Sequence, residues 1–198
     1  MLKMKANKHK KKKTLKEIKG IKSKISEKDS EISSLEITLS QKIAITSRSA
    51  GGILIGRAMT ERPDLFAVAI PEAGLLNPIR LNMTQISPYQ EYEFGNVKDS
   101  VECLALYEMD SYHHLTDGTN YPATLVTAGV LDPKIPLWMP VKFVARLQSV
   151  NGSSKPILFW ANPKIGHYFD TKSQHIESMA DALSFALWQT GHPDFQLK

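Results

Sequence analysis

Residues 42–54, KIAITSRSAGGIL, decide how this chain folds. The run Ile43–Thr46 is apolar and rich in β-branched residues, which predicts a strand, and the apolar run that begins at Ile53 predicts a helix. The residues between them are small apart from Arg48, which predicts a sharp corner with Ser49 at its centre. Such a corner puts its central residue into a strained backbone conformation and needs small neighbours, because bulky ones would clash. We therefore expect the Ser49 hydroxyl to stand clear of the sheet edge.

The corner is close to the pattern G-x-S-x-G, which places a reactive serine between a strand and a helix. Ser47 stands where that pattern has its first glycine. Serine is small enough for the turn to survive, but the string by itself also fits an ordinary strand-to-helix turn. The start of the helix adds free backbone N–H groups and a partial positive charge, which would face the serine. The rest of the chain decides between these two interpretations.

The composition is that of a folded globular domain. The chain has 198 residues, of which 42% are hydrophobic and 23% charged, enough for one domain with a hydrophobic core. Cys103 is the single cysteine, so no disulfide can form within the chain. No apolar run approaches the roughly 18 residues of a membrane span, and no apolar segment follows the basic N-terminus as in a secretory signal. We therefore expect a cytoplasmic location and no membrane partner, although an N-terminally truncated chain would have lost any signal.

The positive charge is concentrated near the N-terminus. Residues 1–42 hold 13 lysines and 5 acidic residues, a net charge of +8, whereas residues 43–198 hold 12 basic and 15 acidic residues, a net charge of −3. The run Lys10–Lys13 is typical of a solvated tail, and attraction to nucleic acid is the alternative. No aromatic residue is interleaved with these lysines to stack on bases, so no specific nucleic-acid partner is expected. We interpret residues 1–41 as a basic leader, degenerate or disordered in part, with a loose amphipathic helix within residues 14–39.

Beyond the corner, predicted strands alternate with predicted helices, which favours an α/β fold in three layers with a mostly parallel sheet. In such sheets, chemistry takes place in the loops beyond the carboxyl ends of the strands. Ser49, Asp132 and His167 each lie in such a loop, in the chain order of an α/β-hydrolase. The predicted strands cover residues 65–70, 121–129 and 157–160, and the predicted helices cover residues 53–60, 100–109, 138–150 and 174–189.

A serine, a histidine and an aspartate together supply the groups that acyl transfer needs. Ser49 would attack, His167 would accept and return the proton, and Asp132 would orient the imidazole. The N–H of Ala50 would donate to the oxyanion, a contribution of about 3–4 kcal/mol. Taken singly, Asp132 in an Asp-Pro pair is more typical of a turn, and His167 after a glycine is more typical of a surface loop. Their positions at successive strand ends favour the catalytic interpretation.

Two further groups with reactive side chains carry no chemistry in this interpretation. His113-His114 has no third residue at ligand spacing, so we predict a loop there, with no metal and no cofactor for the chain. Cys103 lies in a predicted helix, and no motif around it indicates a nucleophile.

Several long blocks of the sequence resemble the catalytic domain of the prolyl oligopeptidase family of serine peptidases, in order and spacing, from about Lys42 to the C-terminus. This resemblance implies that Ser49, Asp132 and His167 form a catalytic triad. It also implies that Lys134 stands where the family often has an arginine that grips a substrate carbonyl, with loss of the bidentate fork. Ile135 and Phe94 fall in segments that line the family's proline-accepting pocket. The blocks are SRSAGG (47–52), GRAMTERPDLFAVAI (56–70), YEFGNVKDS (92–100), YHHLTDGTNYPATLVTAGVLDPKIPLWMPVKFVARLQ (112–148), GSSKPILF (152–159), IGH (165–167) and FALWQTGHPDFQ (185–196).

Parts of the family's architecture have no counterpart ahead of residue 42: a β-propeller, the first strands of the hydrolase sheet, and a tyrosine of the oxyanion hole. The resemblance therefore implies that residues 42–198 are the C-terminal part of a truncated α/β-hydrolase peptidase domain. The expected function is serine-type hydrolysis of short peptides, with cleavage after proline as one specificity. The alternative is an inactive or split-gene fragment that needs a propeller-containing N-terminal chain as its partner. The triad by itself leaves an esterase open as well.

Overall fold

The computed structural model describes residues 2–85 and 87–196, with side chains from Lys19 onward, and it divides the chain into two compact units, Met1–Leu39 and Ser40–Lys198. The first unit consists of the helix α1 (Leu2–Ser40). This helix is longer than the predicted segment 14–39 and includes the lysine run, whose side chains lie outside the described residues. The large apolar side chains described in α1 are all more than half exposed: Ile21, Ile25, Ile32, Leu35, Ile37 and Leu39.

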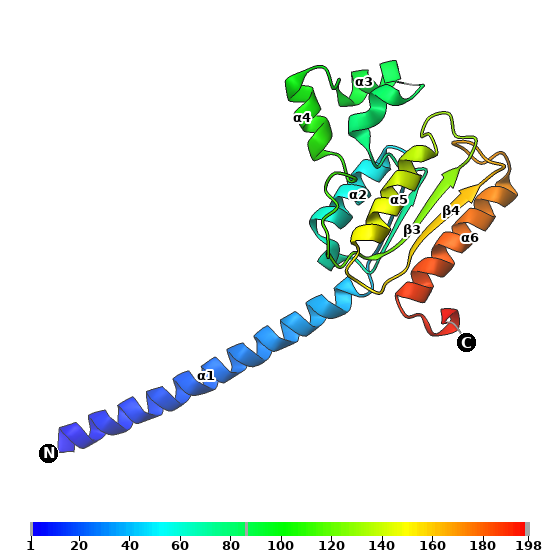
Figure 1. The fold of residues 1–198 in the computed structure, drawn as a ribbon. Coiled ribbons are helices and arrows are strands. Elements are labelled where there is room, and N and C mark those ends of the chain that lie inside the picture. The colour runs from blue at the N-terminus through cyan, green and yellow to red at the C-terminus, as the bar shows by residue number, and fades with distance from the viewer. Residues whose placement is uncertain (1, 86, 197–198) are drawn as a thin grey trace. The chain divides into compact units, whose positions relative to one another are not determined.

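A sheet of four parallel strands forms the centre of the second unit (Figure 1). The strands are paired in the order in which they occur along the chain, β1-β2-β3-β4. Parallel neighbours need a crossover connection, and helical segments provide it between each pair of strands. The strands are β1 (Ala44–Arg48), β2 (Val68–Glu72), β3 (Ala123–Gly129) and β4 (Ile157–Asn162).

Helices cover both faces of this sheet and make three layers, as Figure 1 shows. On one face, α2 and α5 bury Met59 and Phe143 against Val126 of β3. On the other face, α6 buries Phe185 against Val68 of β2. The predicted three-layer α/β class with a parallel sheet is confirmed. The helices are α2 (Gly51–Glu61), α3 (Ser87–Phe94), α4 (Ser100–Glu108), α5 (Trp138–Val150) and α6 (Lys172–Gln189), with short 3₁₀ segments η1 (Pro63–Leu65), η2 (Pro78–Met83) and η3 (Pro193–Phe195).

Within the second unit, the largest error in the sequence-based boundaries concerns the second strand. The sequence predicts a strand over residues 65–70, but β2 runs from Val68 to Glu72. The reason is Pro63, which starts the 3₁₀ turn η1 and takes Leu65 into it. The last helix, α6, begins two residues earlier than predicted, because Thr171 and Gln174 form a capping box at its start. The predicted helix over residues 138–150 agrees with α5 at both ends.

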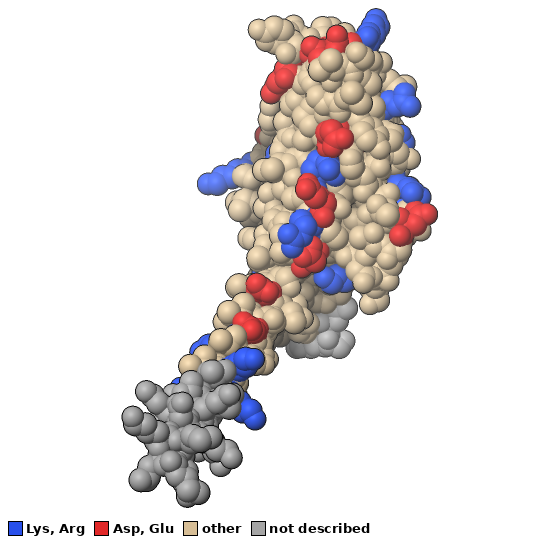
Figure 2. Space-filling model, turned by 90° about the vertical axis from the view of Figure 1, so that its left-hand side faces the viewer, with Lys and Arg blue, Asp and Glu red and all other residues tan. Residues whose placement is uncertain are grey.

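No described helix combines the length and the apolar character that a membrane crossing requires. On the face that Figure 2 shows, Lys and Arg side chains are interspersed with Asp and Glu, and among the residues drawn in colour no large patch of one sign forms. Mixed charges of this kind are typical of an ordinary solvated surface.

Candidate active site

Ser49 lies at the corner between β1 and α2 with a φ of 56°, in the left-handed region. A non-glycine residue there is strained, so the predicted strained corner is confirmed. The Ser49 N–H donates to the Glu72 carbonyl at 3.0 Å, and the Leu75 N–H donates to the Ser49 carbonyl at 2.9 Å. Position 52 requires glycine, because a Cβ on Gly52 would lie 2.6 Å from the Leu75 nitrogen. The segment after β2 therefore holds the serine in a conformation that it would otherwise avoid.

Ser47 occupies the first glycine position of the pattern without breaking the turn. A Cβ added to Gly51 would lie 2.9 Å from the Ser47 Cβ, so the two positions face each other closely. The Ser47 hydroxyl is buried and has no hydrogen-bond partner among the described residues. The Ser47 side chain fits because residue 51 is a glycine and has no side chain.

The three predicted residues come together beyond the carboxyl ends of the strands. Ser49 follows β1, Asp132 lies in the loop after β3, and His167 lies in the loop after β4. Strands β3 and β4 are paired up to their last residues. The two loops then touch, because a Cβ on Gly129 would lie 2.2 Å from the Gly166 carbonyl oxygen. The close approach at this glycine lets the acid and the imidazole meet.

The hydrogen bonds among these side chains form a continuous chain. His167 Nε2 lies 2.9 Å from Ser49 Oγ, and His167 Nδ1 lies 2.7 Å from Asp132 Oδ2. The side chains of His167 and Asp132 are 4% and 1% exposed, and Ser49 is half-buried. An ionised carboxylate can only accept, so Asp132 takes the hydrogen on Nδ1 and leaves Nε2 to accept from the serine hydroxyl. This arrangement can move a proton from the hydroxyl to the imidazole.

The second carboxylate oxygen of Asp132 is held by the backbone. Asp132 Oδ1 accepts from the N–H groups of Lys134 at 2.8 Å and Ile135 at 2.9 Å. The residue therefore closes a turn, as its Asp-Pro pair predicts, and faces the histidine at the same time. These two hydrogen bonds fix the carboxylate that orients the ring.

The other predicted site residues lie around this chain. Ala50 is the exposed N-cap residue of α2, directly after Ser49, and its N–H donates to no acceptor among the described residues. The Lys134 ammonium donates to the Tyr168 hydroxyl at 3.1 Å and lies 4.8 Å from the centre of that ring. Because Tyr168 directly follows His167, Lys134 stands at the edge of the site.

Ile135 and Phe94 meet in one apolar cluster. Ile135 is 3% exposed and packs in a buried core with Leu106 and Met139, and Phe94 packs against the same core. The sequence predicts that both residues belong to pocket-lining segments. In this structure, the Ile135 side chain is enclosed by the protein itself.

Arg48 and Phe169 are close to the site, and sequence reasoning did not select them. The Arg48 guanidinium donates to the His167 carbonyl and lies 4.5 Å from the centre of the Phe169 ring. The one available signal was position, because Arg48 directly precedes Ser49 and Phe169 follows His167 by two residues.

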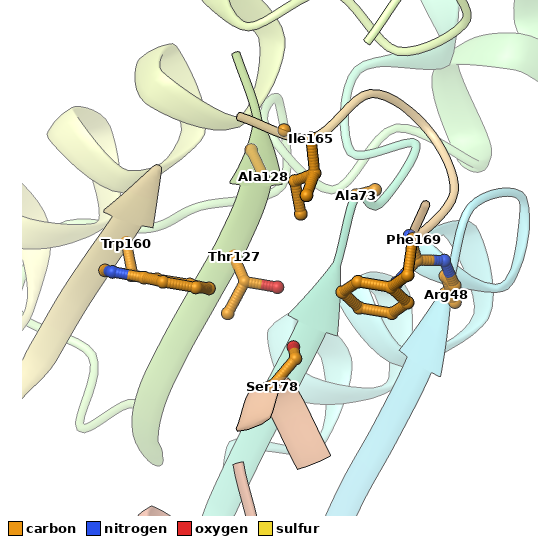
Figure 3. Close-up of a pocket in the computed structure, with 9 residues that line it drawn as sticks. Arg48, Ala73, Thr127, Ala128, Trp160, Ile165, Phe169 and Ser178 are labelled. Carbon is orange, nitrogen blue, oxygen red and sulfur yellow. The ribbon is translucent and has the colours of Figure 1, made fainter. Parts of the chain in front are cut away.

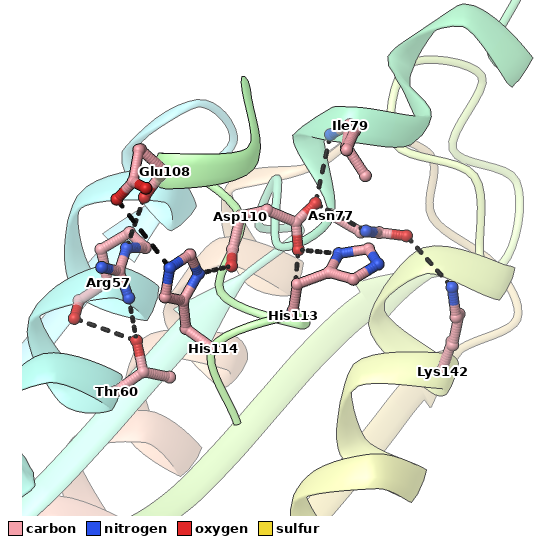
Figure 4. A network of polar contacts seen from close by, with 9 residues as sticks. All are labelled: Arg57, Thr60, Asn77, Ile79, Glu108, Asp110, His113, His114 and Lys142. Carbon is pink, nitrogen blue, oxygen red and sulfur yellow. Dashed lines mark hydrogen bonds and ion pairs between the residues drawn. The ribbon is translucent and has the colours of Figure 1, made fainter. Parts of the chain in front are cut away.

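His113 and His114 belong to a separate polar network, drawn in Figure 4. The His113 ring lies 3.0 Å from the buried Asp110 carboxylate, and the His114 ring lies 2.7 Å from the Asp110 carbonyl. Within the described residues, no group of three His, Cys, Asp or Glu side chains could hold a metal ion. The predicted loop is present, and its histidines bind Asp110.

The fold and the serine–histidine–aspartate geometry define a protein of the α/β-hydrolase type. The sequence profile of the Prolyl oligopeptidase family matches residues 29–193, so the chain belongs to that family. This match begins earlier than Lys42, where the sequence blocks place the start of the resemblance, and it includes the last part of α1.

Relatives of known name agree with this assignment. The prolyl endopeptidase of Elizabethkingia meningoseptica is 33% identical over 156 residues, 78% of this chain and 22% of that protein. Protease 2 of Moraxella lacunata is 26% identical over 153 residues, 76% of this chain and 22% of that protein. The chain therefore spans about a fifth of the length of these relatives.

Solved structures show the same fold. One of two prolyl endopeptidases analysed for inter-domain dynamics matches with a TM-score of 0.69 and 30% identity, over 77% of this chain and 21% of that one. Oligopeptidase B from Leishmania major matches with a TM-score of 0.71 over 76% of this chain and 21% of that one. At 23% identity, this second likeness concerns the fold alone.

Proposed function

We propose that this chain carries the catalytic residues of a serine peptidase that hydrolyses short peptides. The observation that supports the proposal most strongly is the hydrogen-bonded chain from Ser49 Oγ through His167 to Asp132. Ser49 is the nucleophile, His167 the general base, and Asp132 the residue that holds the imidazole tautomer.

In the acylation step, Ser49 Oγ attacks the peptide carbonyl carbon while its proton passes to His167 Nε2. The Nδ1 hydrogen stays on the imidazole, where Asp132 stabilises the positive charge. The carbonyl oxygen becomes an oxyanion, and the Ala50 N–H is placed to donate to it. The C–N bond then breaks as His167 gives the proton to the leaving amine. In the deacylation step, His167 takes a proton from a water molecule as that water attacks the acyl carbonyl carbon. The acid then leaves as the proton returns to Ser49 Oγ.

Proline is the first cleavage-site residue to test, because two of the relatives are prolyl endopeptidases, 33% and 34% identical to this chain. Lys134 is the proposed contact for a substrate carbonyl, from its place at the edge of the site next to Tyr168. Lysine offers a point charge in place of a planar fork, so we expect it to hold the substrate less rigidly than arginine would. Ile135 and Phe94 would shape the proline side of the site through the apolar cluster that they share.

A fluorophosphonate probe tests the activated serine directly. Labelling of the wild type at Ser49, identified by peptide mass, and no labelling of Ser49→Ala is the expected result. Turnover of a proline p-nitroanilide, compared with a lysine p-nitroanilide and a simple ester, then sorts peptidase from esterase and reports the preferred residue. An unlabelled wild-type protein that is folded by circular dichroism would refute an activated Ser49.

We further infer that the free edge of β1 is completed by additional polypeptide, either upstream in the same protein or on a partner chain. Among the described strands, none pairs with β1 on the side away from β2. An unpaired edge of this kind is a template for another strand. Beside it, a groove of about 360 Å³ lies between β1, β2 and α6, lined by apolar side chains that include Ile45, Ile70, Met179 and Leu183. The match covers only 22% of the Elizabethkingia meningoseptica relative. The family resemblance implies that the first strands of the hydrolase sheet precede the matched region, so that preceding segment is the candidate occupant.

Co-expression with that preceding segment of the Elizabethkingia meningoseptica relative tests the idea. We expect the two polypeptides to co-purify, with higher probe labelling than for the chain alone. Leu183→Glu, in the groove, should abolish co-purification, and Leu104→Glu, on α4 and also more than half exposed, should not. A chain that is monomeric and fully active alone, and that ignores the added segment, would contradict the inference.

A further inference from the structure

We propose that Arg48 and Phe169 form a clasp that positions His167 for Ser49, so that Arg48 is a positioning residue of the site; this rests on the proposed function. Arg48 is the last residue of β1, and the nucleophile follows it directly. Its guanidinium donates to the His167 backbone carbonyl and stacks on Phe169, two residues further along the same loop. Figure 3 shows Arg48 and Phe169 side by side at the carboxyl edge of the sheet. One side chain thus joins the segment of the nucleophile to the segment of the base.

The strand side of the clasp is fixed by a carboxylate. Arg48 is the register partner of Glu72, the last residue of β2, and its Nη1 lies 3.6 Å from Glu72 Oε2. The other oxygen of that carboxylate lies 3.4 Å from the Thr46 hydroxyl. The side chains of Arg48 and Glu72 are 30% and 20% exposed, so the pair is partly shielded from solvent. Glu72 therefore restrains the Arg48 guanidinium independently of its contacts with the His167 loop.

The loop side of the clasp is fixed by the last helix. Phe169 stacks on His175 of α6, with ring centres 5.1 Å apart and an angle of 20° between the planes. Arg48 and Phe169 line a cavity of about 10 Å³ together with Thr127, Ile165 and Ser178. This cavity has room for at most about one water molecule. In this structure, Arg48 and Phe169 therefore pack against their neighbours with little space left in this cavity.

The clasp matters because it acts on the backbone of His167, whereas Asp132 acts on the ring. The carboxylate sets the tautomer and the rotation of the imidazole, but it leaves the path of the loop undetermined. A displacement of about 1 Å between reacting groups can cost roughly a hundredfold in rate. Arginine suits this task because its planar group can donate, pair and stack at once, whereas lysine can only donate and pair.

Arg48→Met, Arg48→Lys and Phe169→Leu test the clasp in the full chain. We expect Arg48→Met to lower the rate of fluorophosphonate labelling and kcat by about 10- to 100-fold with KM within about twofold, because positioning and not substrate binding is lost. Arg48→Lys should fall between Arg48→Met and the wild type. Arg146→Met is the matched control, since Arg146 is an exposed arginine of α5 that pairs with Asp117.

Amide hydrogen exchange of residues 163–171 gives a readout that needs no activity. Exchange in this loop should be faster in Arg48→Met and Phe169→Leu than in the wild type, and unchanged in Arg146→Met. If the wild type is not labelled at all, the proposed peptidase function fails while the exchange experiment still tests the clasp. If Arg48→Met is labelled at the wild-type rate and exchanges like the wild type, the clasp is refuted and the peptidase proposal stands. A circular dichroism spectrum of each variant separates either result from misfolding.

Discussion

Asp132 and Asp110 are two buried aspartates that each hold a histidine ring. His167 Nδ1 lies 2.7 Å from Asp132 Oδ2, and His113 Nδ1 lies 3.0 Å from Asp110 Oδ1. Backbone N–H groups also donate to both carboxylates, from Ile135 in the first case and from His113 itself in the second. In these contacts of the carboxylate with a histidine ring and with backbone N–H groups, the two aspartate–histidine pairs are alike.

The pairs differ at the far side of the ring. His167 Nε2 meets the Ser49 hydroxyl, which the strained corner directs toward it. The His113 ring lies beside Tyr107 and Tyr112 instead, and the nearby Ser111 hydroxyl has no hydrogen-bond partner among the described residues. The aspartate–histidine pair by itself therefore does not distinguish the proposed active site, whereas the hydroxyl held against the second ring nitrogen does.

The Asp110 pair has a structural role that Figure 4 makes visible. Asp110 Oδ2 accepts from the Asn77 amide at 2.7 Å and from the Ile79 N–H at 3.1 Å. These donors lie at the start of η2, so the carboxylate ties η2 to the segment before His113. The fully buried Asp110 carboxylate accepts three hydrogen bonds, and removal of a donor would leave part of its hydrogen-bonding capacity unused in the interior.

The largest difference between the pairs should appear when each histidine is removed. His167→Ala should lower kcat for a peptide p-nitroanilide by about 10³-fold or more, because the general base is lost. His113→Ala should leave kcat within about twofold of the wild type. Steady-state kinetics of both variants, with circular dichroism to verify folding, measures this. Equal losses in the two variants would remove the distinction between the pairs.

Replacing each aspartate by asparagine should separate activity from stability. Asp132→Asn should lower kcat by about 10³- to 10⁴-fold with little change in the free energy of unfolding, because the amide favours the wrong tautomer of His167. Asp110→Asn should destabilise the protein by about 1–3 kcal/mol, because the NH₂ that replaces one oxygen would face a backbone N–H donor, that of Ile79 at Oδ2 or that of His113 at Oδ1. Urea unfolding and kinetics of both variants provide the measurement. A large stability loss in Asp132→Asn with normal activity would reverse the assignment.

The contact between the loops of Asp132 and His167 can be tested at Gly129. A Cβ there would meet the Gly166 carbonyl oxygen at 2.2 Å, so Gly129→Ala must push the two loops apart. We expect a loss of about 1–3 kcal/mol in the free energy of unfolding and a fall of about tenfold or more in kcat. Gly20→Ala in α1 is the control, since a Cβ there meets nothing within 4 Å. Thermal unfolding and probe labelling of the two variants decide whether this glycine is needed for close approach.

The sequence was sufficient to predict the fold and the meeting of Ser49, Asp132 and His167 at one edge of the sheet, since strand ends can be recognised from local patterns. Ser49, Asp132 and His167 each follow an apolar run, and parallel pairing brings such positions to one edge. Arg48 and Phe169 could not be found in this way, because their contact joins residues far apart in the chain and no periodic pattern encodes it. The enclosure of Ile135 was equally invisible, since it depends on how η2 and α4 pack over the loop. The predicted start of the second strand was wrong, because an apolar run by itself does not reveal that Leu65 belongs to the turn that begins at Pro63.

Asp64, an exposed aspartate that pairs with an arginine, should show the smallest effect. Asp64 accepts from Arg62 at 2.8 and 2.6 Å, and this hydrogen-bonded guanidinium lowers the pKa of the Asp64 carboxyl below its usual value. A folded-state pKa that is lowered contributes stability above the unfolded pKa and loses it as the pH falls through the folded pKa. Both side chains are more than half exposed, so solvent screens the pair. Arg62→Gln should therefore leave the unfolding midpoint at neutral pH nearly unchanged, with any small difference from the wild type vanishing in acid. A clearly lower unfolding midpoint of Arg62→Gln at neutral pH would show that burial is not the reason for the larger effects expected at Asp110 and Asp132.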